Sequence, residues 1–259
     1  MLVDNKFIFL SLPRCASTSV EYSFILSKFN TQHVNPFTSE KNSLIDFTKV
    51  PQSDIMSYIE HGHETLVELE EKFGHNYPII AVKRDRRARF FSLYQHILYD
   101  LRRVGELELY EHFKNLTATE LFFFDKEDLV SKASRWNVLN DYIVKNRLKS
   151  RAVTLNLTKS NLISTENRME GYYMNILDIL ITPLSFWHNH DTRIKWFDIK
   201  NIVEMEDWIR FTTKKPFTLE KVNSNIEEES TVKLDDAFIK AYDKIYDYYD
   251  KPKFNKTLI

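Results

Sequence analysis

Residues 6–29 constrain the fold of this 259-residue chain more than any other part of its sequence. They open with an unbroken apolar run, residues 7–10, as expected of a strand that is covered on both faces of a parallel sheet. Pro13 then ends the strand, and apolar residues recur at helical spacing after it. A strand, a short loop and a helix in immediate succession predict an α/β protein.

The loop of this first stretch gathers groups that bind an anion. Arg14 is followed by three consecutive hydroxyl residues, Ser17, Thr18 and Ser19, at the expected start of the helix. Backbone N–H groups at a helix start point toward an anion, and hydroxyl and guanidinium groups add donors. We therefore predict a cradle for phosphate or sulfate, although the loop alone also suits a simple helix N-cap.

A second stretch, residues 78–99, repeats the pattern of an apolar strand, a basic turn and a helix. Arg84 leaves the end of the strand, and Ser92 lies one to two turns into the helix. The stripe expected to be buried in this helix consists of Phe90, Tyr94, Ile97 and Leu101. Ligands of open α/β sheets bind at the carboxyl ends of the strands, so both polar residues can reach one phosphate there. Two separate anion sites suggest a ligand with a phosphate at each end.

Both stretches resemble motifs of the sulfotransferases that use 3′-phosphoadenosine 5′-phosphosulfate. Residues 12–19, Leu-Pro-Arg-Cys-Ala-Ser-Thr-Ser, are similar to the family's 5′-phosphosulfate loop, commonly Pro-Lys-x-Gly-x-Thr-Ser. Residues 83–92 are similar to the 3′-phosphate motif, an Arg-Asp-Pro turn followed by Arg-hydrophobic-x-Ser. The chain departs from the pattern with Arg14 for the usual Lys, Ala16 where Gly is common and Arg86 where Pro is common.

A third segment, residues 60–63 (Glu-His-Gly-His), resembles the His-Gly-His segment of the uronyl and heparan sulfate 2-O-sulfotransferase branch, where a histidine is the base. The resemblance implies that His63 takes the proton of an acceptor hydroxyl, which suits an imidazole of near-neutral pKa. It also makes His61 a candidate for contact with the substrate. The alternatives for two such histidines are a solvated surface or half of a metal site. No Cys or acidic cluster lies nearby in the sequence to complete a zinc set, so no metal is expected.

The resemblance implies that the cofactor is 3′-phosphoadenosine 5′-phosphosulfate and the product adenosine 3′,5′-bisphosphate. Arg14 then also stabilises the charge that develops as the sulfuryl group leaves. The residues implied to bind the cofactor are Arg14, Cys15, Ala16, Ser17, Thr18, Ser19, Arg84, Ser92, Asn223 and Ser224. Asn223 and Ser224 belong to a stretch similar to one that closes over the nucleotide, for which an ordinary polar turn is the alternative. Trp136 is a candidate for the acceptor cleft, with packing as the default.

Composition limits the partners. The chain has 36 Lys and Arg against 37 Asp and Glu, a net charge of −1, which argues against general attraction to nucleic acid or a membrane. Its single cysteine, Cys15, excludes an intrachain disulfide and fits a reducing compartment. The first residues predict neither a signal peptide nor a membrane span. With the resemblance, this suggests a cytoplasmic relative of prokaryotic or viral type, whose oligomeric state the sequence does not indicate.

We predict one α/β domain over residues 1–259, with a mainly parallel central sheet between helices on both faces. This three-layer, P-loop nucleotide-kinase-like architecture is the one that sulfotransferases share, and a helical lobe is expected from about residue 207. We also predict a short helix over residues 65–73 that stops at Gly74. Residues 30–50 are predicted to be irregular, and residues 198–205 to form a strand.

The function implied by the resemblance is direct transfer of a sulfuryl group to a hydroxyl of a carbohydrate or similar acceptor. Two other classes stay open. A nucleotide or small-molecule kinase of related architecture is disfavoured by the missing P-loop glycines and Lys. A non-catalytic nucleotide- or carbohydrate-binding protein would keep the anion cradle. Residues 188–191 (His-Asn-His-Asp) weakly match a metal or nuclease fragment, and a solvated loop is the preferred interpretation.

Overall fold

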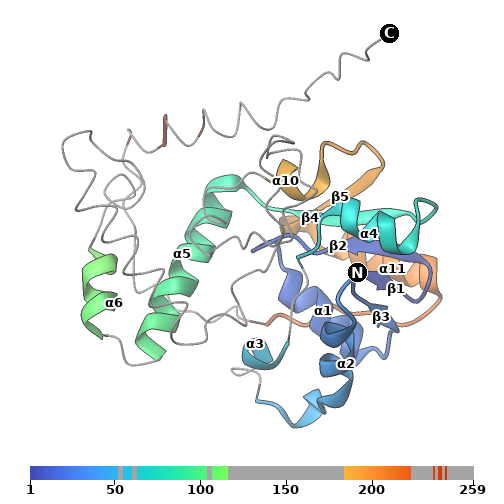
Figure 1. Ribbon diagram of the computed structural model, residues 1–259, viewed down its shortest axis with the longest axis horizontal. Coiled ribbons are helices and arrows are strands. Elements are labelled where there is room, and N and C mark those ends of the chain that lie inside the picture. Colours follow the sequence, from blue (N-terminus) through green and yellow to red (C-terminus); the bar gives the residue numbers. More distant parts are fainter. Residues whose placement is uncertain are drawn as a thin grey trace.

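The computed structural model describes residues 1–51, 55–59, 63–103, 107–115 and 184–222, together with residues 236, 239, 240 and 243. Within these ranges the chain forms a mixed five-stranded sheet that is flanked by helices (Figure 1). The strand order is β3-β1-β2-β4-β5. The strands are β1 (Leu2–Val3), β2 (Phe7–Leu10), β3 (Thr31–Gln32), β4 (Ile79–Lys83) and β5 (Ile194–Asp198). The predicted α/β class is confirmed.

The half of the sheet made by β2, β4 and β5 is parallel. Leu10 of β2 lies opposite Ala81 of β4, and Lys83 at the end of β4 lies opposite Asp198 at the end of β5. Every residue of β2 is buried, as the unbroken apolar run predicts. Because the three strands run in one direction, the loops that follow them emerge at the same edge of the sheet.

The other half is antiparallel, so the prediction of a mainly parallel sheet is wrong for two of the four pairings. Strand β1 pairs with β2 and β3 in antiparallel register. A tight turn joins β1 to β2, with Asp4 and Asn5 at φ of 48° and 53° and a hydrogen bond from Lys6 N to Val3 O of 2.8 Å. Two successive left-handed residues are the geometry of a type I′ hairpin, which reverses the chain and forces antiparallel pairing.

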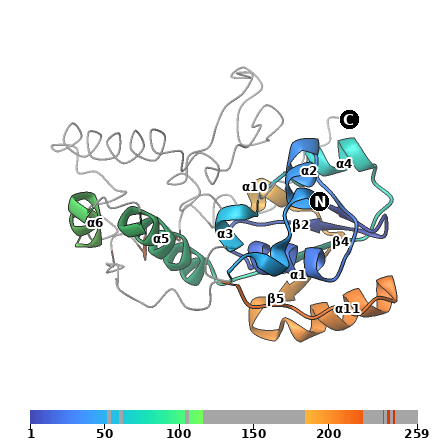
Figure 2. The same cartoon turned by 90° about the horizontal axis from the view of Figure 1, so that it is seen from below.

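Helices cover both faces of the sheet. On one face lie α1 (Ser17–Leu26) and α11 (Val203–Thr213), and the ring of Phe7 lies 6.1 Å from that of Phe24 and 5.1 Å from that of Trp208. Figure 2 shows α4 (Leu66–Phe73) and α10 (Ser185–His188) on the side opposite α11. The remaining helical segments are α2 (Pro36–Leu44), α3 (Ile55–Tyr58), α5 (Arg86–Arg103), α6 (Leu107–Lys114) and the 3₁₀ turns η1 (Phe47–Lys49) and η6 (Ile199–Asn201).

The helix predicted over residues 65–73 is confirmed as α4. Thr65 and Glu68 form a reciprocal capping box at its start, and Gly74 follows its last turn at φ 89°. In α5, Phe90 and Tyr94 are buried as predicted and their rings stack 6.3 Å apart. The side chains of Ile97 and Leu101 lie outside the described set.

Two predictions of local structure are wrong. Residues 30–50 are not irregular: they contain β3, α2 and η1. Pro36 is the first residue of α2, where its missing N–H costs nothing, and the Asn35 side chain accepts from Phe37 N. The strand predicted over residues 198–205 is also wrong, because β5 ends at Asp198 and α11 begins at Val203.

Several predicted features lie outside the described residues: His61, Trp136, Asn223, Ser224 and most of the lobe expected from residue 207. α11 spans the predicted start of that lobe and packs on the sheet through Trp208. In the part of the chain that is described, no helix combines the length and apolar character needed to cross a membrane.

Candidate functional site

The loop between β2 and α1 has the backbone form of an anion nest. Arg14 and Ala16 both adopt the left-handed conformation at φ 61°, with Cys15 between them. Ala16 is the N-cap of α1 and makes no side-chain capping bond. The first intrahelical bond runs from Val20 N to Ala16 O at 3.0 Å, so the N–H groups of the residues before Val20 precede the helical ladder. Left-handed residues at a helix start gather such N–H groups into a concave, electropositive surface.

A cleft of about 460 Å³ opens beside this nest at the carboxyl edge of the sheet. Its volume is in the range of about 300–1,000 Å³ that is typical of small-molecule sites. Its lining residues are Arg14, Ala16, Ser17, Thr18, Ser19, Arg84, Ser92, Gln95, Ile199, Ile202, Leu219, Lys221 and Val222. They come from the segments that follow all three parallel strands, β2, β4 and β5.

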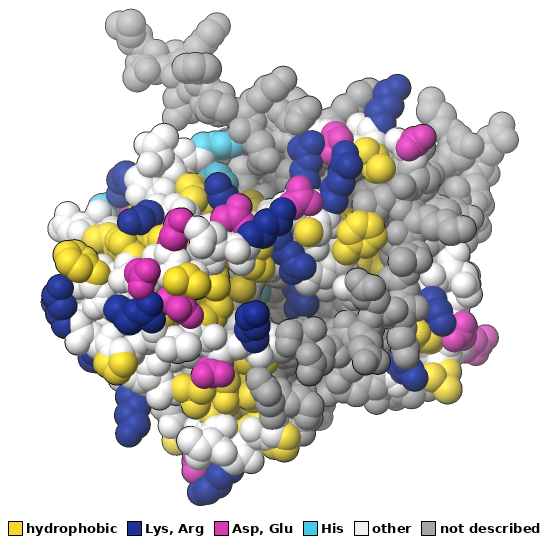
Figure 3. Space-filling model, turned by 180° about the vertical axis from the view of Figure 1, so that it is seen from behind, with side chains coloured by type: hydrophobic (Ala, Val, Ile, Leu, Met, Phe, Trp, Pro, Cys, Tyr) yellow, Lys and Arg dark blue, Asp and Glu magenta, His cyan; other side chains and the backbone are white. Residues whose placement is uncertain are grey.

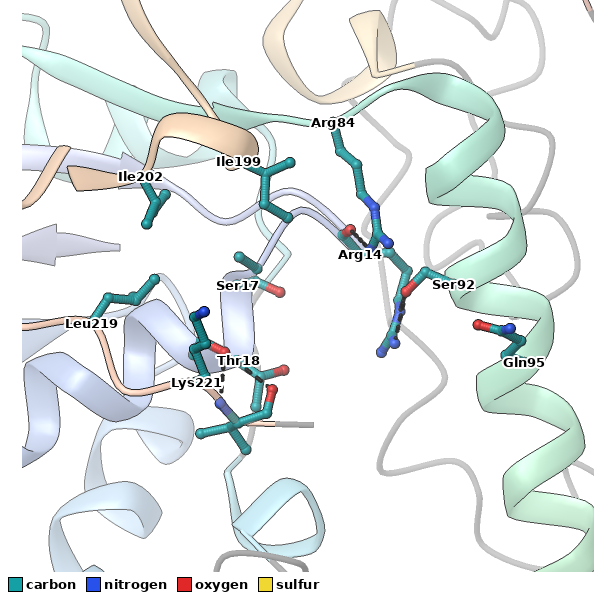
Figure 4. Close-up of a pocket in the computed structure, with 13 residues that line it drawn as sticks. Arg14, Ser17, Thr18, Arg84, Ser92, Gln95, Ile199, Ile202, Leu219 and Lys221 are labelled. Carbon is teal, nitrogen blue, oxygen red and sulfur yellow. Dashed lines mark hydrogen bonds between the residues drawn. The ribbon is translucent and has the colours of Figure 1, made fainter. Parts of the chain in front are cut away.

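The two sequence motifs meet in this cleft. Arg14 donates from Nε and Nη2 to the Ser92 hydroxyl at 3.2 and 3.1 Å, and Arg84 Nη1 donates to the Arg14 carbonyl at 3.3 Å (Figure 4). Arg14, Arg84 and Ser92 therefore lie in one cleft. The two anion sites predicted from the motifs would be adjacent parts of its wall, because Arg14 and Ser92 are in direct contact.

The cleft is strongly cationic. Among the described side chains that line it, Arg14, Arg84 and Lys221 are cations and none is a carboxylate. Partial burial lowers the pKa of Arg84, opposed by the nearby Cys15 and Asp85, but a guanidinium stays protonated at neutral pH. A chain with a net charge of −1 has thus placed local positive charge around one cavity.

One end of the cleft is apolar. Ile199 in η6, Ile202 before α11 and Leu219 lie together on the side of the cleft opposite Arg14, Ser92 and Gln95 (Figure 4). Such a surface suits a flat, weakly polar ring, while the other end suits anionic groups. Sequence reasoning missed these residues and also Gln95. Lys221 begins the stretch 221–224 that the resemblance places over the nucleotide, although only Asn223 and Ser224 were predicted as contacts. Ile199 directly follows β5, so a correct assignment of that strand would have found it.

Cys15 does not join the cleft, which corrects its predicted contact with the cofactor. Its side chain is 1% exposed and belongs to the hydrophobic core, and its N–H donates to Leu12 O at 3.2 Å. Burial raises the pKa of the thiol to about 11 despite the neighbouring Arg89, Arg84 and Arg14. The left-handed residues on either side turn Cys15 inward while the rest of the loop faces the cleft.

The basic run after β4 divides into three roles. Arg84 lines the cleft, whereas Arg86 and Arg87 form ion pairs with Asp243 at 2.7 and 3.1 Å. Arg89 is a core residue: it is 1% exposed, donates from Nε to Pro13 O at 3.0 Å and lies 5.4 Å from the Trp187 ring. Its side chain ties α5 to the loop that forms the nest.

His63 lies at the end of β2, next to the nest, rather than in the lining of the cleft. Its Nδ1 is 2.7 Å from Ser11 O, and a carbonyl can only accept, so Nδ1 carries the proton. The neutral ring therefore presents Nε2 as its proton acceptor. Ser11 is in turn held by Glu21, because its hydroxyl donates to Glu21 Oε1 at 2.7 Å. A buried network thus sets both the orientation and the tautomer of His63.

Residues 188–191 form the end of α10 and the turn that follows it, in which Asn189 is exposed and the other three residues are partly buried. The ring of His188, the last residue of α10, lies 5.1 Å from that of Trp196, and its Nδ1 accepts from His190 N at 3.1 Å. Burial lowers the pKa of His188 to about 4. Asp191 bonds Arg193, which also reaches Glu70 of α4. In the described ranges no three His, Cys, Asp or Glu side chains come together as metal ligands.

The described part of one face of the molecule has a mixed charge (Figure 3). Figure 3 shows Lys and Arg side chains interspersed with Asp and Glu over the described part of the face behind Figure 1. A face of mixed charge does not create the extended positive electrostatic potential that attracts a nucleic acid backbone.

Comparisons with protein-family models, with curated proteins and with solved structures found no significant match to this chain. The chemistry and geometry of the cleft are therefore the basis for assigning a function to this chain.

Proposed function

We propose that this chain is a sulfotransferase that moves a sulfuryl group from 3′-phosphoadenosine 5′-phosphosulfate to the hydroxyl of a carbohydrate or similar acceptor. The observation that carries the proposal is the meeting of Arg14, Arg84 and Ser92 beside an uncapped helix start, in a cleft whose described lining residues include no carboxylate. A ligand with anionic groups and a flat ring matches both ends of that cleft.

In this proposal the α1 end of the cleft binds the 5′-phosphosulfate. The N–H groups before Val20, with the hydroxyls of Ser17 and Thr18, donate to the phosphate. Arg84 and Ser92 bind the 3′-phosphate. The ring lies against Ile199, Ile202 and Leu219.

The chemical step is an in-line displacement at sulfur. The acceptor oxygen forms a bond to sulfur, and the bond between sulfur and the bridging oxygen of the 5′-phosphate breaks. The acceptor proton passes to Nε2 of His63, the ring nitrogen left basic by the bond from Nδ1 to Ser11 O. Arg14 stabilises the negative charge that remains on the departing bisphosphate.

Titration calorimetry tests the nucleotide. Adenosine 3′,5′-bisphosphate is expected to bind without a divalent cation and at least about 10-fold more tightly than ATP with magnesium. The reverse preference would favour a kinase of related architecture and overturn the proposal.

A transfer assay tests the reaction. Wild-type protein is expected to move sulfate from 3′-phosphoadenosine 5′-phosphosulfate to a member of a panel of sugars and small alcohols. His63→Ala is expected to keep the affinity for the bisphosphate and to lose transfer by about 10²- to 10⁴-fold, the usual contribution of a positioned base. Full transfer by this variant would remove His63 from the mechanism.

A further inference from the structure

Residues 217–222, called the strap here, follow α11 and cross α1 at the rim of the cleft. The strap is held along its length: Arg210 Nη1 donates to Phe217 O at 2.6 Å, and Leu219 N donates to Glu206 Oε1 at 2.7 Å. The ring of Phe217 also lies 5.1 Å from that of Phe24 in α1. The strap is therefore a docked segment, and two of its side chains, Leu219 and Lys221, line the cleft.

The seam between the strap and α1 is made by two serines one helical turn apart. Ser19 Oγ accepts from Val222 N at 3.1 Å and donates to Val222 O at 3.2 Å. Ser23 Oγ accepts from Glu220 N at 2.8 Å and donates to Ser19 O at 2.7 Å. Lys221 lies between the two residues that these serines hold.

The bond from Ser19 to Val222 changes the role expected for Ser19. A serine hydroxyl has a single proton, and this one is donated to a backbone carbonyl, so it is not available to a phosphate at the same time. The place of Ser19 in the loop resembles that of a phosphate donor, but its hydrogen bonds serve the strap.

Charge explains why the position of the strap matters. Each phosphate monoester carries about −1.5 to −2 charges at neutral pH, so a doubly phosphorylated nucleoside carries about −3 to −4. Arg14 and Arg84 offset two of these charges, and the start of α1 about half of one more. Lys221 is the third cation among the described residues that line the cleft.

We propose that Ser19 is a positioning residue: it anchors the strap and thereby holds Lys221 against the anionic groups of the bound nucleotide. The identity of that nucleotide rests on the proposed function. The anchoring and the cationic role of Lys221 do not, because they concern any polyanion in the cleft.

The test combines two measurements on the full chain. The first is hydrogen exchange without ligand, in which Ser19→Ala is expected to speed exchange of the Val222 amide by about 10-fold or more. The second is titration calorimetry with adenosine 3′,5′-bisphosphate and, separately, with inorganic pyrophosphate. Ser19→Ala and Lys221→Gln are each expected to weaken binding by about 10-fold, the loss typical of one charge-assisted contact.

The double variant distinguishes positioning from direct contact. If Ser19 acts through Lys221, then Ser19→Ala combined with Lys221→Gln binds no more weakly than Lys221→Gln alone. Losses that multiply would show that Ser19 touches the ligand itself and would overturn the proposal, as would unchanged exchange at Val222 in Ser19→Ala. Ser23→Ala gives a second route, because Ser23 holds the strap but does not line the cleft. Ser23→Ala is expected to weaken nucleotide binding when Lys221 is present and to cause no further loss when it is combined with Lys221→Gln.

Lys215→Gln is the matched control. Lys215 precedes the strap and pairs with Asp4 at 2.5 Å, away from the cleft, so binding is expected to stay within about 2-fold of wild type. If wild type binds pyrophosphate but not the bisphosphate, the proposed function fails. Comparing the single and double variants with pyrophosphate as the ligand then still decides the role of Ser19. Binding of neither probe would overturn both.

Discussion

The corner where β2 enters α1 and the corner where β4 enters α5 have similar sequences and different chemistry. Each follows a buried parallel strand and each supplies an arginine to the cleft. At the start of α5, Asp85 Oδ1 accepts from Arg87 N at 3.0 Å and from Ala88 N at 2.9 Å. At the start of α1, the N-cap residue is Ala16, which adopts the left-handed conformation and makes no side-chain capping bond.

This difference decides how each corner can bind an anion. At the start of α5 the Asp85 carboxylate already accepts from two of the first N–H groups, and its negative charge repels a second anion. The β4–α5 corner therefore contributes side chains alone, Arg84 and Ser92, whereas the β2–α1 corner contributes its backbone. Two motifs that look alike as sequences are complementary halves of one site, and the predictions below test that division.

Arg14→Ala should have the largest effect, because Arg14 belongs to one corner and bonds Ser92 of the other. Removing a preorganised donor in such a site typically costs about 10²-fold or more, so sulfate transfer should fall by at least that factor. Arg14→Lys keeps the charge and should retain most of the rate. Steady-state transfer assays measure both, and near wild-type turnover of the alanine variant would contradict the assignment.

Arg84→Ala should weaken binding only of nucleotides that carry a 3′-phosphate, which would distinguish the role of the β4–α5 corner from that of the β2–α1 corner. Affinity for adenosine 3′,5′-bisphosphate should fall about 10- to 100-fold, as expected when a charged hydrogen bond is lost, while affinity for adenosine 5′-phosphate stays nearly unchanged. Calorimetry with both nucleotides provides the measurement. Arg87→Ala, which removes an exposed ion pair with Asp243, is the control. An equal loss for both nucleotides would mean that Arg84 does not bind the 3′-phosphate.

Cys15 reports on the β2–α1 corner through pH. Because burial raises the pKa of the folded thiol from 9.0 to about 11, the unfolded thiol ionises first as the pH rises. The contribution of the thiol to the free energy of unfolding is fully present below pH 9 and should fall by about 2 kcal/mol as the pH rises to 11. Urea unfolding of wild type and Cys15→Ala at several pH values measures the difference between them. That difference should shrink as the pH rises, and two parallel curves would contradict the burial of the thiol.

Asp85→Ala tests the capped corner. Loss of a helix cap costs about 1 kcal/mol, or about 2–4 °C in the thermal midpoint for a chain of this size, whereas affinity for the bisphosphate should not fall. Asp207→Ala, which changes an exposed aspartate inside α11, should move the midpoint by less than 1 °C. Weaker nucleotide binding by Asp85→Ala would indicate that this corner binds through its backbone after all.

Ala16→Gly should have the smallest effect of these variants, and it should raise the free energy of unfolding rather than lower it. A glycine at φ 61° avoids the strain of a left-handed alanine, so the fold should gain about 0.5–1 kcal/mol. Ala88→Gly, in the first turn of α5, should instead lose up to about 1 kcal/mol. Thermal unfolding compares the two, and a loss for both would contradict the left-handed nest.

The parts of the fold that could be predicted are those with a local cause. An apolar run four residues long followed by Pro13 predicts β2, and Thr65 with Glu68 predicts the start of α4 from capping chemistry alone. The short edge strands β1 and β3 have no such signal, because two residues show no period. The turn at Asp4 and Asn5 folds β1 back on β2, and β3 then pairs with the other edge of β1.

The candidate site also contains residues that could be named from the sequence and residues that could not. Arg14, Arg84 and Ser92 could be named from the sequence because each follows a recognisable strand at a fixed spacing. Lys221 could not be placed, since its position depends on Ser19 and Ser23, about 200 residues away in the chain. The apolar end was missed because residues 198–205 alternate like a strand, although the strand had already ended at Asp198.

Arg89 imposes a limit on how this chain can diverge. Within a run of five cations it looks exchangeable, but it is a core side chain that bonds Pro13 and faces Trp187. A lysine side chain lacks the planar guanidinium group that can donate to Pro13 O and lie over the Trp187 ring at the same time. Among descendants of this sequence, position 89 should therefore remain arginine while the more exposed positions 86 and 87 vary faster, so substitution rates alone would distinguish the core cation from the surface ones.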